Sequence, residues 1–355
     1  MATAVQSQPM QSSRPSIEID GKPQPRLEAA LVSYELADRI DSMARAELCF
    51  GNWGGEDHPG FQHFDRNTIE FGKALVVKQG DAKLFEGRIT AIAAEYPEGA
   101  TPQISVLAED RLQDLRMTRR TRCFAQASLA DVARSIAQDH GLTPQVDVNA
   151  PAVPLLAQLN QSDLAFLTDT ARRYDADVHV EGQTLIVAAA RQFTAAKLAW
   201  AGTLRSFSVI ADLANQRSAV VAAGWDVSRK EAINHRAAKD AASQEIGQDE
   251  AGGDILSRAL GDRVETLAHQ VPANESEARQ VAEAAYRHMA RNFVTGEGVC
   301  ETSALVRAGA KLELSGLGPL FDGAYRALSV THLFDPEHGA RSEFRCNRAG
   351  LGRAQ

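Results

Sequence analysis

Two stretches of the chain, about 236 residues apart, share a pattern of glycine and apolar residues. In the first, the run GKAL at 72–75 is followed by LFEG at 84–87 and an alternating, strand-like segment. In the second, GAKL at 309–312 is followed by LFDG at 320–323 and another alternating segment. A single repeat of this length predicts a pair of similar domains rather than a solenoid of many short units. Coincidence between two ordinary hairpins is the alternative.

Each LF[ED]G element has a simple structural interpretation. The acidic residue and the glycine would form a turn or bulge, while the phenylalanine would close one end of a β-barrel. On this interpretation Phe85 and Phe321 occupy equivalent buried places, and Gly87 and Gly323 occupy equivalent turns. These four are the candidate structural turn and plug residues.

Alternating apolar residues dominate both ends of the chain. About six short strands with frequent turn signals are expected in 16–117, which predicts a first small, closed or nearly closed β-barrel. The pattern returns to strands in 196–355, which predicts a second barrel. Residues 1–15 are rich in Ser, Gln and Pro and are expected to form a flexible tail.

The middle of the chain, 118–195, is expected to form an α+β insert. Ser128 followed by Asp131 is typical of a capping box at the start of a helix, and Gly141 is well placed to end that helix. A second helix is predicted over 163–174, before a short hairpin. The predicted fold class is therefore β-rich α+β, with two similar barrels flanking the insert.

Two further segments are expected inside the second barrel domain. Residues 229–254 are polar, contain few branched apolar residues, and are predicted to form a mobile loop. Residues 275–292 carry an apolar stripe at helical spacing after Asn274, which predicts a capped helix.

Composition limits the classes of partner. The 355 residues carry a formal charge of −8, and the pI is near 5.7, so the whole chain has no basic footprint for nucleic acid or anionic lipid. No apolar run approaches the roughly 20 residues that cross a bilayer, and no signal peptide is recognisable, so no membrane insertion is expected. The four cysteines form no CxxC pair, which favours reduced thiols in the cytoplasm.

The sequence contains no catalytic motif: GxSxG, HExxH and a P-loop are all absent. His58 and His63 could ligate a metal with Asp57 or Asp65, but exposed loop histidines are the favoured interpretation. The neighbouring carboxylates at 56–57 and 109–110 could suggest glycosidase chemistry, although adjacent residues on a strand point to opposite faces. We therefore assign no catalytic, cofactor-binding or metal-binding residue, and expect neither enzyme activity nor a cofactor.

The one dense basic run consists of Arg116, Arg119, Arg120 and Arg122. Contact with DNA is conceivable, but no aromatic residues alternate with the arginines. A domain or subunit junction is the favoured interpretation, and nucleic acid is expected only as passing cargo.

Several segments in order along the chain resemble the phage late control protein D family, whose fold is shared by the N-terminal part of VgrG proteins and by baseplate hubs of contractile injection systems. The segments that carry the resemblance include 85–92 (FEGRITAI), 160–167 (NQSDLAFL), 321–325 (FDGAY) and 344–348 (FRCNR). No single segment is specific, and the resemblance rests on their order and spacing over roughly 16–348.

The resemblance implies a structural, β-rich hub. In the family, three chains with two barrels each form a pseudo-sixfold ring that adapts a sixfold inner tail tube to a threefold spike. VgrG proteins continue into an OB-fold and a β-helix, whereas this sequence stops at Gln355, so a separate spike polypeptide is expected. The expected partners are two further copies, the tube protein, the spike and other baseplate proteins of a phage tail, tailocin or extracellular injection system. Such a particle would assemble in the bacterial cytoplasm. A cell-wall-degrading or other enzyme of the tail tip is the alternative.

Overall fold

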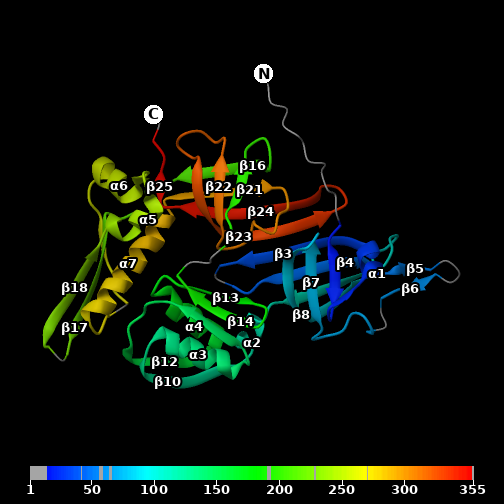
Figure 1. Ribbon diagram of the computed structural model, residues 1–355, viewed down its shortest axis with the longest axis horizontal. Helices are drawn as coiled ribbons and strands as arrows, with labels where there is room; N and C mark the ends of the chain where they lie inside the picture. Colours follow the sequence, from blue (N-terminus) through cyan, green and yellow to red (C-terminus); the bar gives the residue numbers. More distant parts are fainter. Residues whose placement is uncertain are drawn as a thin grey trace.

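The computed structural model describes residues 14–40, 42–55, 59–63, 66–189, 193–227, 229–269 and 271–353. The chain is β-rich, with two large groups of strands, a compact α+β insert, and a helix-containing arm (Figure 1). Of the predicted N-terminal tail only Arg14 and Pro15 are described, and the Arg14 guanidinium donates to the carbonyl of Ala29 at 2.9 Å.

Six strands from the first third of the chain form the first sheet unit. Along the sheet they lie in the order β1-β7-β8-β9-β4-β3, and every neighbouring pair is antiparallel. The bounds are β1 (Ser16–Ile19), β3 (Leu31–Arg39), β4 (Arg45–Gly51), β7 (Ala74–Gln79), β8 (Ala82–Glu95) and β9 (Gln103–Glu109). Short elements at its margin are β2 (Lys22–Pro23), α1 (Pro25–Ala30), and the hairpin of β5 (Trp53–Gly54) and β6 (Gly60–Phe61).

Six strands from the last third form the second sheet unit, in the order β15-β22-β23-β24-β21-β16. The bounds are β15 (Ala196–Ala199), β16 (Leu204–Ala211), β21 (Val294–Cys300), β22 (Lys311–Ser315), β23 (Gly323–Asp335) and β24 (Gly339–Arg348). When the six strands of each unit are numbered in chain order, both units have the same spatial order in the sheet, 1-4-5-6-3-2. They differ in one pairing, because β15 is parallel to β22 whereas β1 is antiparallel to β7.

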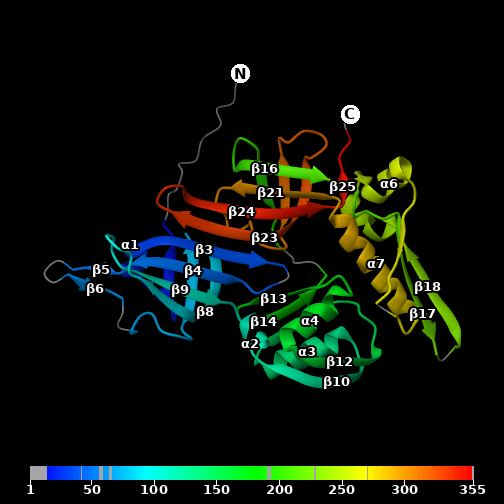
Figure 2. The same cartoon turned by 180° about the vertical axis from the view of Figure 1, so that it is seen from behind.

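The two units share one continuous sheet rather than forming two separate barrels. β3 pairs antiparallel with β23, and this pairing joins both units into a sheet of 13 strands (Figure 2). Among the described residues the sheet does not close, because the terminal strands β16 and β2 do not pair with each other. The prediction of two barrels is corrected accordingly. Alternation specifies which face of a strand is buried but not which strand will lie against its free edge.

Bulges occur at matching places in the two units. The register of β8 on β9 shifts between Ile89 and Ala91, and that of β23 on β24 shifts between Ala327 and Ser329. A second pair of shifts occurs where β3 meets β4 and where β16 meets β21, each next to the first residue of the earlier strand. Because a bulge adds one residue to one strand, matching bulges fix which residues of the two units correspond.

The LF[ED]G elements do not occupy equivalent places. Leu75 lies opposite Gly87, whereas its counterpart Leu312 lies opposite Tyr325, so the two elements are displaced by two residues. Gly87 lies inside β8 rather than in a turn, while Gly323 is the first residue of β23, with φ of +139°. Phe85 is buried in β8, but Phe321 precedes β23 and is half-buried. The predicted equivalence of these residues is therefore wrong, although the strand orders agree.

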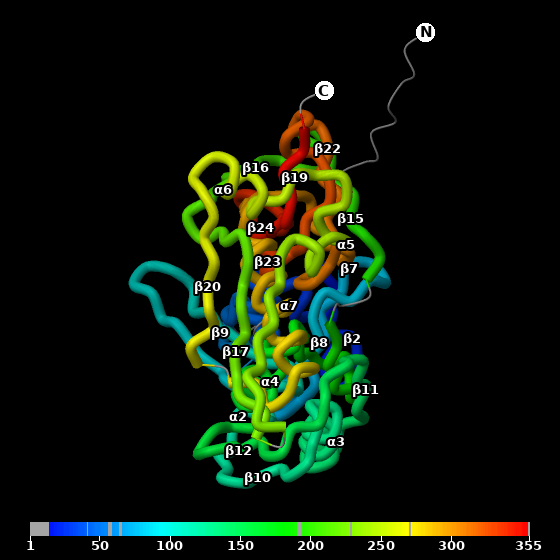
Figure 3. Tube along the Cα trace, turned by 90° about the vertical axis from the view of Figure 1, so that its left-hand side faces the viewer, coloured from blue at the N-terminus to red at the C-terminus, as the bar shows by residue number. Residues whose placement is uncertain are grey.

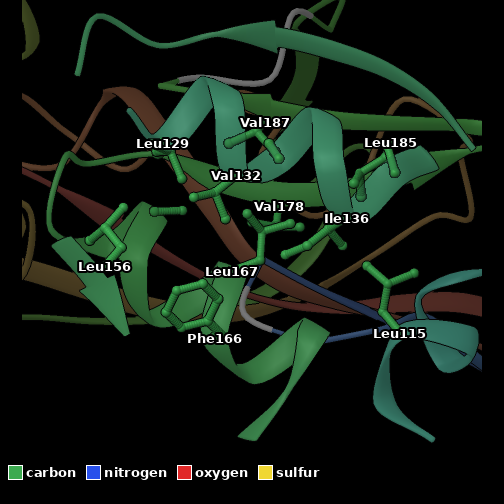
Figure 4. Close-up of a cluster of buried hydrophobic side chains, with 14 of the residues drawn as sticks. Leu115, Leu129, Val132, Ile136, Leu156, Phe166, Leu167, Val178, Leu185 and Val187 are labelled. Carbon is green, nitrogen blue, oxygen red and sulfur yellow. The ribbon is translucent and has the colours of Figure 1, made fainter. Parts of the chain in front are cut away.

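The insert folds around its own apolar core (Figure 4). It is joined to β9 by α2 (Leu112–Arg116), and Leu115 packs into the same core. Its elements are β10 (Arg119–Ala127), α3 (Leu129–Asp139), β11 (Thr143–Asp147), β12 (Val153–Ser162), α4 (Asp163–Arg172), β13 (Asp177–Glu181) and β14 (Thr184–Ala188). The apolar faces of α3 and α4 meet over side chains from β13 and β14, which confirms the two helices and the hairpin read from the sequence.

The capping box at Ser128 is present as predicted. The Ser128 hydroxyl accepts from the backbone amide of Asp131 at 3.2 Å, and the Asp131 carboxylate accepts from the amide of Ser128 at 3.0 Å. We expect Ser128→Ala to lower the free energy of unfolding by about 1 kcal/mol, because it leaves a helix N-terminal donor without its acceptor. Urea denaturation measures this loss; an unchanged midpoint would show that the cap contributes nothing to stability.

An arm is inserted between β16 and β21. It consists of β17 (Ala219–Asp226), β18 (Glu231–Ala237), a 3₁₀ turn (Lys239–Ala242), α5 (Ser243–Ile246), β19 (Glu250–Ala251), α6 (Gly252–Leu260), β20 (Val264–Thr266) and α7 (Glu275–Arg291). Figure 3 shows α7 running beside β17, and Asn274 caps this helix as predicted by accepting from the amide of Glu277 at 2.9 Å. β19 pairs with β25 (Gly350–Leu351) near the end of the chain.

The segment 229–254, predicted as a mobile loop, contains four of these elements and the start of α6. Its buried side chains are mostly alanines that pack against alanines of α7, together with Ile233 and Ile246. Small side chains let a helix and a sheet approach closely, so few branched residues are needed for a core there. The composition of the segment was therefore a poor guide to its structure.

Candidate functional site: the charged junction of the insert

The arginine run does not form one common junction surface. Arg116 pairs with Glu109 of β9 at 3.3 Å and so links α2 to the first sheet unit. Arg119 donates to the carbonyl of Asn160 at 3.4 Å, within the insert. Arg120 and Arg122 also point to acceptors inside the insert.

One of these acceptors is the buried carboxylate of Asp163. It accepts from Arg122 at 2.9 Å, from Gln158 at 2.8 Å and from His140 at 2.8 Å, with Arg120 at 3.3 Å. Burial raises the pKa of Asp163, but the hydrogen bonds and the two guanidinium charges outweigh burial and hold the pKa below its usual value. Asp163 therefore holds donors from several elements of the insert together around one buried charge.

The insert is joined to the arm by a second buried carboxylate, which the sequence analysis missed. Asp175 follows α4 and accepts from Arg291 of α7 at 2.5 and 2.7 Å, in a two-pronged pair. Arg287, one turn earlier, donates to Asp175 at 2.8 Å, and Glu245 of the arm holds the other side of Arg291 at 2.6 and 2.7 Å. Planar guanidinium groups suit such paired carboxylates. We call Asp175, Glu245, Arg287 and Arg291 the junction cluster.

Electrostatics keep the junction cluster charged. Burial lowers the pKa of Arg291, but its two carboxylate partners more than reverse this effect and leave the pKa raised. Burial likewise raises the pKa of Asp175, and the bonds and charge of Arg291 reverse it, so this pKa is lowered. The only sequence signals were an arginine on the otherwise small-residue face of a helix and an aspartate just after another helix.

A second set of contacts ties β13 of the insert to the second sheet unit. Arg326 of β23 pairs with Asp177, and Arg307 lies 3.5 Å from Glu181 and 4.0 Å from the ring centre of Phe193. Ion pairs between side chains therefore attach the insert to the second sheet unit.

A cleft of about 460 Å³ lies among the first sheet unit, the insert and the second sheet unit. Its lining includes Phe85 and Gly87 from β8, Glu181 from β13, and Arg307. Phe321 and Gly323 do not line it, so the structure does not bring the four candidate turn and plug residues together.

The candidate metal ligands and paired carboxylates show no shared site where they are described. Asp57, His58 and Asp65 lie outside the described residues, and the described part of the chain holds no cluster of three or more His, Cys, Asp or Glu side chains suited to a metal. Asp110 has a structural task, because it accepts from the amides of Ala44 and Leu112 at 2.8 and 2.9 Å.

His332 is a buried titratable group at the β3–β23 pairing. Its ring nitrogen lies 2.7 Å from the Ser342 hydroxyl, and burial, with a smaller effect of Arg307, lowers its pKa to about 4. Because the folded pKa lies below the unfolded value of about 6.5, the unfolded state takes up the proton first on acidification. Stability from this residue is complete above about pH 6.5 and is lost progressively as the pH falls to about 4.

We therefore expect His332→Asn, which cannot titrate, to show a shallower loss of stability than the wild type between these two pH values. Urea midpoints measured across the range check this. Parallel slopes for the two proteins would contradict the role of His332.

Comparison with known proteins identifies the family of this chain. Residues 10–335 match the family model described as the Alg8 N-terminal domain. The chain belongs to this family. No curated protein matches the sequence at a significant level. These comparisons do not show membership of the late control protein D family, which the sequence resembles.

Solved structures share the fold of this Alg8 N-terminal domain protein. The prophage MuSo2 43 kDa tail protein from Shewanella oneidensis is 12% identical, with 95% of this chain and 98% of that chain covered and a TM-score of 0.69. A tail protein from Neisseria meningitidis MC58 is 13% identical, with 96% and 97% covered and a TM-score of 0.68. An E. coli component of the type VI secretion system, described as similar to T4 bacteriophage tail proteins gp27 and gp5, is 11% identical, with 95% and 79% covered and a TM-score of 0.58. The chain therefore has the fold of these phage tail proteins and of this type VI secretion component.

Among the described residues, no helix combines the length and the apolar character that crossing a bilayer requires.

Proposed function

We propose that this protein is a structural component of a phage-like tail, and specifically the central hub of a contractile baseplate. Three copies would form a ring that contacts a sixfold inner tube on one face and a separate threefold spike on the other. The observation that supports this most directly is the pair of six-stranded units with one strand order, matching bulges and a shared sheet. Three copies of such a chain present six similar units while keeping true threefold symmetry.

The junction cluster fits this proposal. A hub that transmits load between a tube and a spike needs fixed angles between its parts. The buried, two-pronged pair of Asp175 with Arg291 holds the insert and the arm at one angle, because such a pair tolerates little displacement. We propose that the insert and the arm are the surfaces that meet other baseplate proteins, with Arg116 at the junction to the first sheet unit.

Affinity purification of particles through a tag on this chain tests the proposal. We expect tube, sheath and spike proteins of one particle to be recovered together with the chain, and the purified chain to release no fragments from peptidoglycan. Recovery of the chain without tube or spike proteins would contradict the hub, and peptidoglycan release by the pure chain would favour the enzyme of the tail tip instead.

A further inference from the structure

The pairing of β3 with β23 shows how one unit receives the edge of the other. β23 is 13 residues long, and only its first part pairs with β22. Its second part, from Ser329 to Phe334, pairs with β3 from Arg39 back to Tyr34. The long strand thus offers half of one edge to a strand outside its own unit.

The counterpart of β23 in the first unit is β8, and half of its edge is open. β8 pairs with β7 only as far as Arg88. Beyond the bulge, Ala91–Glu95 pairs with β9 on one side and, within the described residues, with no strand on the other. The counterpart of β3 is β16, which pairs only with β21 in the part of the chain described and ends the sheet (Figure 2).

We infer that β16 of one copy pairs antiparallel with the second half of β8 of the next copy, in the way that β3 pairs with β23 inside the chain. This inference rests on the proposed hub and names the strands through which its copies join. Three such pairings would join the sheets of three chains into a ring and would occupy both the free edge of β16 and the open half of β8. Unpaired strand edges bind other strands readily, so an occupied edge also explains why these edges can be long.

The matching bulges predict the register of this intermolecular pair. Leu31 and Leu204 precede equivalent bulges, so Leu36 corresponds to Val209 and Ala37 to Ile210. On the other strand, Ile89 and Ala327 precede equivalent bulges. The residues that correspond to one another there are Thr331 with Ala93, His332 with Ala94, and Phe334 with Tyr96.

Transferring the observed pairs Thr331–Ala37, His332–Leu36 and Phe334–Tyr34 gives three predicted contacts between copies. Ala93 would lie opposite Ile210, Ala94 opposite Val209, and Tyr96 opposite Phe207. In this register the charged side chains of Glu95 and Asp212 lie opposite Ser208 and Ala91, so no two charges face each other.

Grooves on the two units support the same correspondence independently. A groove of about 120 Å³ in the first unit is lined by Ala37, Thr90 and Ala108, among others. A groove of about 360 Å³ in the second unit is lined by their counterparts Ile210, Leu328 and Cys346. The bulge residues Thr90 and Leu328 therefore sit in the same place in both units.

Side chains at the occupied β3–β23 junction are more buried than the corresponding side chains at the open edges of β8 and β16, as the inference requires. At the occupied junction Tyr34 is 4% exposed, and it stacks on Phe334 with ring centres 5.7 Å apart. At the open edges Tyr96 is 63% and Ile210 is 58% exposed, and Phe207 is half-buried. An intermolecular Tyr96–Phe207 pair would repeat the Tyr34–Phe334 stack with the two aromatic types exchanged.

The side chains around Tyr96 strengthen this apolar end. Trp53 and Phe61 of the β5–β6 hairpin are 46% and 50% exposed, with ring centres 5.2 Å apart, and Phe61 lies 6.3 Å from Tyr96. Contiguous exposed aromatics of this kind mark a protein interface. A second copy is the occupant that the structure favours, because the chain already contains the template of the contact.

Disulfide trapping tests the pairing with the full chain. In a Cys123→Ser background, which removes an exposed thiol, the double variant Ala93→Cys/Ile210→Cys should form covalent dimers and trimers on mild oxidation. The matched control Ala37→Cys/Thr331→Cys occupies the equivalent places inside the chain and should cross-link within a single chain. The offset variant Ala93→Cys/Ser208→Cys shifts one partner by two residues and should give at least tenfold less intermolecular product.

The outcomes separate this inference from the hub itself. Intermolecular cross-links at Ala93 and Ile210, with little product from the offset variant, support the pairing. A native mass of three chains, with the internal control cross-linked but no Ala93–Ile210 product, would overturn the pairing and leave the trimeric hub standing. A single-chain mass together with no Ala93–Ile210 product would overturn the pairing and count against the trimer as well.

Discussion

Asp175→Ala is expected to lower the free energy of unfolding by about 3 kcal/mol, because it removes the more deeply buried of the two carboxylates that hold Arg291 and leaves this guanidinium with Glu245 alone. Arg291 is 8% exposed and would lose both of its bonds to the Asp175 carboxylate, while Arg287 would lose one. An arginine side chain keeps its proton at ordinary pH, so Arg291 cannot escape the cost by becoming neutral. Urea denaturation measures the loss.

Two further variants make this result specific. Arg134→Ala removes an exposed pair with Asp131 at 3.1 Å on the surface of α3 and should shift the midpoint little. The double change Asp175→Leu/Arg291→Met removes both charges and should recover much of the loss. A loss for Asp175→Ala no larger than that for Arg134→Ala would contradict a stabilising role of the junction cluster.

Gly87→Ala is expected to destabilise the protein by about 1–3 kcal/mol through overpacking. A methyl group at this position would lie 2.5 Å from the carbonyl oxygen of Glu109 and 2.6 Å from the ring of Phe85. The Glu109 oxygen belongs to the backbone of the neighbouring strand and cannot rotate away, so β8 and β9 would have to separate locally. Thermal and urea unfolding both report this change.

Gly51→Ala is the matched control for Gly87→Ala. Gly51 also lies in a strand of the first sheet unit, but a methyl group there would approach only the Ala30 carbonyl, at 3.8 Å. It should therefore cause no loss of stability. Equal losses of unfolding free energy for the two variants would contradict this explanation. They would show that replacing any strand glycine by alanine has this effect, without a contribution from the close approach at Gly87.

Local signals in the sequence predicted local structure well. The capping box at Ser128 and the cap at Asn274 depend on residues three positions apart, and both are present. The buried faces of α3 and α4 follow directly from the helical spacing of their apolar residues. Strand positions were likewise predictable, because alternation is a property of each strand alone.

Features that depend on distant parts of the chain were predicted less well. The sequence repeat suggested duplication, but it aligned Gly87 with Gly323, whereas strand pairing aligns Gly87 with Tyr325. The bulges set the true register, but no particular residue type marks them in the sequence. The junction cluster joins residues 116 positions apart, Asp175 and Arg291, and neither stands out beside the many other charged residues.

Counting the copies of this chain in one assembly tests the central claim most directly. Native mass spectrometry of the purified ring, or quantitative mass spectrometry of whole particles calibrated against the tube protein, gives that number. A closed ring in which each chain supplies two similar units to a sixfold tube predicts three copies. Six copies, or one, would contradict the account, because six would make the two units within each chain redundant and one could not present threefold symmetry.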